Sequence, residues 1–191
     1  MEKEISTPEY YPLSLNALVN ACNQKSNRDP VVSYDEDTVE QALEELRKKG
    51  LAMRISGRDS RVPKHEQRFT EKFNLGRREA ALICVLLLRG PQTVGELRGR
   101  AERLYTFDDL EAVDATLSRL AEMEFVKKLP RRTGFKEQRW AQLLAGDVEE
   151  AVEAPAPAAD RGPSDRDRIV RLEAELAALR QEFDQFRRSF E

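Results

Sequence analysis

Residues 108–129 read DDLEAVDATLSRLAEMEFVKKL, and the rest of the chain is best interpreted from this segment. Its apolar residues return every three or four positions, which predicts a helix with one buried face, and its last residues are typical of a strand. The same spacing occurs 74 residues earlier. The shared positions are Val39, Leu43, Leu46 and Leu51 in the first copy and Val113, Leu117, Leu120 and Phe125 in the second. One structural unit is therefore built twice.

A second match follows each copy of this helix. The segment Glu66–Phe69, preceded by Lys64, returns 71 residues later as Glu137–Trp140, preceded by Lys136. We interpret both segments as the returning strand of a β-hairpin. The chain then consists of a first repeat, residues 1–73, and a second repeat, residues 74–145. Helices followed by a two-stranded hairpin predict a mainly α fold with small β-hairpins (α+β), made of two tandem winged-helix domains.

The two repeats differ at their beginnings. An almost wholly apolar segment, residues 77–89, precedes Pro91 in the second repeat, whereas eleven residues precede the matching Pro12 in the first. Four or five buried aliphatic side chains contribute about 1.5–3 kcal/mol each, which is comparable to the whole stability of a small domain. We therefore expect the first repeat to lack most of its first helix, to be marginally stable, and to have its native start upstream of Met1.

The C-terminal part has a different composition. Residues 146–164, rich in Ala, Pro, Glu and Gly, predict a disordered linker. Residues 165–191 predict a helix with a heptad seam, and the charges beside it suit a parallel two-stranded coil. The alternative is a single amphipathic helix that folds back onto the repeats. The seam that would join a parallel homodimer consists of Ile169, Leu172, Leu176, Leu179, Phe183, Phe186 and Phe190.

Composition excludes several classes of function. The longest apolar run, residues 80–88, is too short to cross a bilayer, and no export signal begins the chain, so we expect a cytoplasmic protein without membrane contact. Cys22 and Cys84 have no CxxC neighbour, and His65 is the single histidine. No metal site, cofactor site or catalytic set can be assembled from these residues. We therefore expect a protein that is not an enzyme.

Four motifs resemble the YceH family of uncharacterised bacterial proteins. They are TPEYYPLS (residues 7–14), ACNQKSNR (21–28), KHEQRF (64–69) and LLLRGPQT (86–93). The resemblance runs from the N-terminus to about Gly146 and implies two tandem winged-helix domains followed by a variable C-terminal coil. Members usually begin with a complete first helix ahead of residues 2–4, and this chain departs from them there. The resemblance implies no established biochemical activity.

Charge separates the third helices from the hairpins. The third helices, residues 35–49 and 108–124, carry net charges of minus three and minus five, whereas the hairpins, residues 54–68 and 127–139, carry plus three and plus five. Winged helices usually bind DNA with the third helix in the major groove and the wing on the backbone. Acidic third helices are repelled by phosphates, so any DNA contact should be made by the basic wings.

The polar turn at residues 23–28 is a further candidate surface, because amide and cationic side chains there exceed the needs of a turn. Two functions remain open. The first is a regulator-like DNA-binding protein that grips phosphates; the alternative is a protein-interaction scaffold that docks through its acidic third helices. The candidate nucleic-acid or partner-binding residues are Asn23, Gln24, Lys25, Asn27, Arg28, Arg58, Arg61, Lys127, Lys128, Arg131, Arg132 and Lys136.

Overall fold

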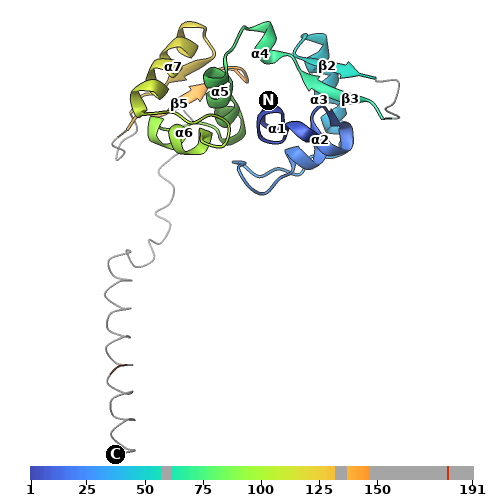
Figure 1. Cartoon of the computed structure of the whole chain (residues 1–191), viewed down its shortest axis with the longest axis horizontal. Coiled ribbons are helices and arrows are strands. Elements are labelled where there is room, and N and C mark those ends of the chain that lie inside the picture. The colour runs from blue at the N-terminus through green and yellow to red at the C-terminus, as the bar shows by residue number, and fades with distance from the viewer. Residues whose placement is uncertain (57–61, 132–136, 147–179, 181–191) are drawn as a thin grey trace, which may run out of the picture. The chain divides into compact units, whose positions relative to one another are not determined.

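The structure is a computed structural model that describes residues 1–56, 62–131, 137–146 and Arg180. The chain divides into two compact units, Met1–Val148 and Glu149–Glu191, and both repeats belong to the first. The described part combines helices with two small antiparallel sheets (Figure 1). The predicted linker after Gly146 and the whole predicted dimer seam, Ile169, Leu172, Leu176, Leu179, Phe183, Phe186 and Phe190, lie outside the described residues.

The first repeat begins with short elements and contains one long helix. Ser14 caps the second helix by accepting a hydrogen bond from the Ala17 amide at 3.3 Å, and Asp35 caps the third by accepting one from Thr38 at 2.9 Å. Its elements are α1 (Glu2–Ser6), the 3-10 helix η1 (Pro8–Tyr10), β1 (Leu13–Ser14), α2 (Leu15–Cys22), α3 (Glu36–Lys48), β2 (Ala52–Ile55), β3 (Lys64–Gln67) and α4 (Phe69–Lys72).

The second repeat has three full helices. Gly90, with φ of 67°, ends the first of them, and this left-handed conformation suits glycine. Thr93 and Glu96 form a capping box at the start of the next helix, and Asp109 caps the last. Its elements are α5 (Arg77–Arg89), α6 (Val94–Ala101), α7 (Leu110–Glu122), β4 (Val126–Lys128) and β5 (Trp140–Gln142).

The sheets correct the predicted match between the two returning strands. β1 pairs with β3 through Leu13 opposite His65, and in the second repeat Gln92 forms an isolated bridge with Trp140. His65 and Trp140, 75 residues apart, therefore occupy equivalent positions, whereas Phe69, which matched Trp140 in sequence, opens α4. The two alignments differ by four residues, an even number, so the inward and outward alternation of a strand cannot distinguish them.

Residues of the first repeat pack against the hydrophobic core of the second. Phe69 of α4 and Phe73, directly after it, pack on Phe125 of the second repeat, with ring centroids 5.7 and 4.9 Å from that of Phe125. Aromatic pairs at these separations stabilise beyond the area they bury. Met1 and Ile5 of the N-terminal segment also pack against this core. The linking helix α4 therefore joins the two repeats into one packed body.

Candidate functional site

The polar turn at residues 23–28 is held by internal hydrogen bonds. The Asn23 side chain donates to the Tyr34 carbonyl at 2.8 Å and accepts from the Tyr34 amide at 2.7 Å. Asn27 has a left-handed backbone, with φ of 58°, and accepts a hydrogen bond from Arg89 at the end of α5. These amide side chains fix the course of the chain from α2 to α3 and hold it against the second repeat.

Arg28 is the most buried cation of this turn, with a side chain only 6% exposed. Its Nη2 lies 2.6 Å from Glu2 Oε2, and it also donates to the Ala21 carbonyl and to Gln24 Oε1. Arg103, from the second repeat, pairs with the same carboxylate. Burial alone would raise the pKa of Glu2, but the hydrogen bonds and charges of these two guanidinium groups lower it.

These contacts change the interpretation of the turn as a binding surface. Arg28 bridges α1 and the turn, and both terminal nitrogens of its guanidinium already donate hydrogen bonds within the chain. Asn23, Gln24 and Asn27 are half-buried and bonded within the chain, and Lys25 is the residue of the predicted set in this turn that is exposed. A long-range ion pair with Glu2 cannot be predicted from sequence spacing, so the structural role of Arg28 was not predicted.

The basic hairpin of the second repeat is described in part. Lys128 and Arg131 are exposed and Lys127 is half-buried. Lys128 Nζ lies 5.5 Å from the centre of the Trp140 ring, a separation at which a cation–π contact forms. The remaining candidates on the hairpins, Arg58, Arg61, Arg132 and Lys136, lie outside the described residues.

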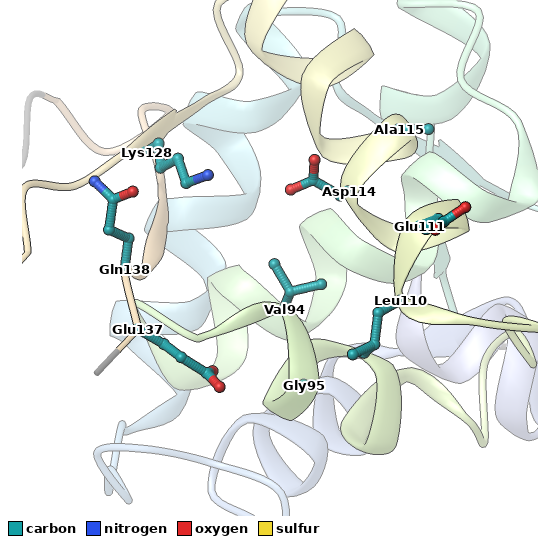
Figure 2. A pocket seen from close by; sticks show the side chains of 9 residues that line it. All are labelled: Val94, Gly95, Leu110, Glu111, Asp114, Ala115, Lys128, Glu137 and Gln138. Atoms are coloured by element: carbon teal, nitrogen blue, oxygen red, sulfur yellow. The ribbon is translucent and has the colours of Figure 1, made fainter. Parts of the chain in front are cut away.

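A pocket of about 560 Å³ lies between α6, α7 and this hairpin, and we call it the α7 pocket (Figure 2). In Figure 2 the Lys128 amine and the Asp114 carboxylate point toward one another across the pocket, and Val94 lies below them in this view. Glu137 extends from the hairpin toward Gly95, and Glu111 points away from Lys128. The full lining is Val94, Gly95, Leu110, Glu111, Asp114, Ala115, Lys128, Glu137 and Gln138.

Helical spacing explains the wall that α7 contributes. Leu110 and Glu111 lie four and three residues before Asp114, so both are neighbours of Asp114 on the helix surface. Val113 and Leu117, on another side, are completely buried in the core. Because packing fixes the buried side of α7, it also directs the acidic side into the pocket. Leu110 is 49% exposed there, which leaves an apolar contact open at the pocket edge.

The chemistry of the α7 pocket suits a cation with an apolar stem. The lining contains three carboxylates, Glu111, Asp114 and Glu137, and one ammonium group, so its net charge is minus two. Val94, Leu110 and Ala115 offer apolar surface to the methylene groups of a lysine or arginine. The acidity of this helix was predicted from sequence. The pocket was not, because Val94 and Gln138 reach it only through the folded positions of α6 and the hairpin.

Two other kinds of site are absent from the described part of the chain. Among residues 1–56, 62–131 and 137–146, no three His, Cys, Asp or Glu residues are grouped so that they could hold a metal ion. None of the helices described there is long and apolar enough to cross a membrane.

Comparison with known proteins places the chain among conserved bacterial sequences. It is 74% identical over 191 residues to a UPF0502 protein of Solibacter usitatus, covering 100% of this chain and 92% of the relative. A UPF0502 protein of Opitutus terrae is 52% identical over 183 residues, covering 94% of this chain and 78% of the relative. The family profile described as "Protein of unknown function, DUF480" matches residues 1–135. The YceH resemblance is thereby confirmed, and the chain belongs to this family, DUF480, whose function is unknown.

Proposed function

We propose that this protein is a non-enzymatic interaction scaffold of two winged-helix domains, and that its α7 pocket receives a basic segment of a partner protein. The observation that carries the proposal is the acidic lining of that pocket beside the third helix of the second repeat. A lysine or arginine side chain would place its charge near Asp114 and its methylene groups on Val94 and Leu110. Charge-assisted hydrogen bonds to carboxylates are among the stronger polar contacts in proteins.

The position of the pocket argues against recognition of DNA bases by the third helix. In a winged helix the third helix normally enters the major groove, and its N-terminal residues meet the base edges. Here the N-terminal turns of α7 carry Asp109, Glu111 and Asp114. Carboxylates on that surface repel phosphates but attract a basic peptide. The same surface is therefore better suited to a protein than to a duplex.

DNA binding through the wings is the second candidate. It is favoured by the net charge of plus five at residues 127–139 and by the exposure of Lys128 and Arg131. About six cations on phosphates would give a log–log salt slope near minus five. Changing Arg131 and Arg132 to Ala should then weaken binding to all duplexes equally.

Peptide binding tests the proposal directly. The probe is a fluorescein-labelled peptide with one arginine flanked by leucines, compared with the same peptide carrying glutamate in place of arginine. We expect the arginine peptide to bind the full chain in fluorescence polarisation, and Asp114→Asn to weaken it by about tenfold. Glu122→Gln, on the same helix but outside the pocket, is the matched control and should leave binding unchanged.

The outcomes separate the two candidates. Equal binding of the two peptides, or no effect of Asp114→Asn, would contradict the scaffold proposal. Electrophoretic shifts with mixed genomic duplexes at about 50 and 200 mM salt test the DNA-binding candidate, because the affinity for phosphates falls by orders of magnitude over that interval. Strong, salt-sensitive shifts without arginine-peptide binding would replace the scaffold by a DNA-binding protein.

Dimerisation through the C-terminal seam stays a prediction. A parallel homodimer would present two α7 pockets and raise the apparent affinity for a partner with two basic segments. Light scattering on the whole chain and on a chain ending at Ala145 tests this. The whole chain should give twice its monomer mass and the shorter chain should be monomeric; equal oligomeric states would refute the seam.

A further inference from the structure

A second hollow, of about 490 Å³, lies at the start of α5 and shares no residue with the α7 pocket. Three arginines from two helices converge on it: Arg77 and Arg78 begin α5, and Arg119 comes from the last turns of α7. We propose that this arginine hollow binds a phosphate monoester group. Its full lining is Asn74, Leu75, Gly76, Arg77, Arg78, Glu79, Tyr105 and Arg119.

Arg78 is held in place before any ligand binds. Its Nε donates to the Tyr105 hydroxyl at 2.8 Å, and its guanidinium carbon lies 5.5 Å from the centre of the Tyr105 ring. Tyr105 is itself packed edge-on against Phe107, which is 3% exposed. Anchoring through Nε leaves the two terminal nitrogens to donate to an oxyanion. A guanidinium fixed in this way loses little conformational entropy on binding.

Arg119 is oriented by a buried carboxylate. Glu79 is 7% exposed, and its Oε1 lies 3.1 Å from Arg119 Nη1, while 61% of the Arg119 side chain remains exposed. The other carboxylate oxygen of Glu79 sits over Gly76, where an added Cβ would approach it to 2.7 Å. Glu79 therefore occupies the space at the helix start, and the donors available to an anion are guanidinium groups rather than backbone amides.

Charge and geometry together select a phosphate monoester. Three guanidinium groups and one carboxylate give the lining a net charge of plus two. A phosphate monoester carries about minus 1.5 to minus 2 at pH 7 and offers three acceptor oxygens, whereas a diester in a nucleic-acid backbone carries a single charge. Planar guanidinium forks match such oxygens in pairs. The hollow therefore complements a terminal phosphate better than a backbone phosphate.

Calorimetric titration of the full chain at low ionic strength and about pH 8 tests this assignment. The probes are inorganic phosphate, O-phosphoserine and dimethyl phosphate, which is a diester. We expect the first two to bind and the diester to bind at least about tenfold more weakly. Arg78→Ala should weaken phosphate binding by about tenfold or more, because it removes charged hydrogen bonds. Arg47→Ala, an exposed arginine paired with Glu44 on α3, is the matched control and should change nothing.

Two further measurements keep the test decisive. Tyr105→Phe retains the aromatic ring but removes the hydroxyl that anchors Arg78, so it should weaken phosphate several-fold without loss of helical circular dichroism. The Arg78 Nε–H resonance should shift on titration with inorganic phosphate. Equal affinities for wild type, Arg78→Ala and Arg47→Ala would overturn the proposal, as would binding of duplex DNA that depends on Arg78 while phosphate and phosphoserine do not bind.

Discussion

The helices α3 and α7 have the same apolar spacing and the same length of 13 residues, yet the folded chain buries them very differently. Val113, Leu117 and Leu120 are completely buried. At the matching positions of α3, Val39 is 7% exposed and Leu46 is 41% exposed. The spacing of apolar residues therefore defines which side of a helix can be buried, and the neighbouring elements decide how far it is.

The neighbouring elements differ mainly in the first helix of each repeat. α7 packs against the 13-residue α5, whereas the corresponding segment of the first repeat contains the five-residue α1 and the short η1. An open hollow of about 450 Å³ remains between the first repeat and the end of α5, and its lining includes Leu18, Leu43 and Leu46. A side chain beside such a hollow has already lost part of the packing that its match in the second repeat retains.

Truncating matched leucines should give the largest contrast. Leu120→Ala removes a completely buried side chain and should lower the free energy of unfolding by about 2–5 kcal/mol. Leu46→Ala removes a partly exposed side chain that borders an existing hollow, so we expect a loss of about 1 kcal/mol or less. Urea unfolding followed by circular dichroism measures both. Equal losses would mean that the first repeat is packed as tightly as the second.

The Glu2 ion pairs should come next in size, because they join the poorly packed repeat to the well-packed one. Glu2→Gln keeps the shape but removes the charge that Arg28 and Arg103 share. Hydrogen bonds to charged groups contribute about 1.5–3 kcal/mol, and we expect a loss in that range. Glu44→Gln, which breaks an exposed pair with Arg47 on α3, is the control and should cost about 0.5 kcal/mol or less. A Glu2→Gln protein as stable as the wild type would show that these ion pairs do not stabilise the contact between the two repeats.

Low pH should weaken the ion pairs of Glu2 with Arg28 and Arg103. The pKa of Glu2 in the folded chain lies below its ordinary value of 4.5, so the unfolded chain binds the proton more readily. The stabilisation is therefore fully present above about pH 4.5 and is lost as the pH falls through the folded pKa. Unfolding free energies of wild type and Glu2→Gln should converge as the pH falls from about 6 to 3. A constant difference across that interval would contradict the assignment of this carboxylate.

The sequence was sufficient for the features that depend on local spacing. The buried side of α7 and the acidity of its exposed side follow from residues three and four apart, and the hairpins follow from the strand pattern after Leu51 and Phe125. The register of the returning strand was predicted wrongly because a shift of four residues preserves the alternation of a strand. The burial of Arg28 was missed because its partner Glu2 lies 26 residues away, beyond the reach of any periodic pattern.

The α7 pocket also combines a feature that local sequence predicts with one that depends on long-range contacts. Glu111 and Asp114 were identified as part of an acidic helix from composition alone. Their arrangement around Val94 depends on how α6 and the hairpin pack beside α7, which is a long-range property of the fold. The arginine hollow was missed for the same reason, since Arg78 and Arg119 are 41 residues apart and meet only when α5 and α7 are packed together.

We expect the smallest difference in stability between the two repeats at their matching helix caps. Ser14 and Thr93 occupy matching N-cap positions, but Thr93 is reinforced by Glu96, which accepts from the Thr93 amide at 2.9 Å, whereas Ala17 stands at the corresponding position of the first repeat. Thr93→Ala should cost about 1–2 kcal/mol and Ser14→Ala about 0.5–1 kcal/mol, because the first change removes one half of a reciprocal pair. Urea midpoints at constant slope measure both. If Ser14→Ala proves the more costly, the first repeat depends on its cap because it has less core, and the reciprocal bond of Glu96 contributes little.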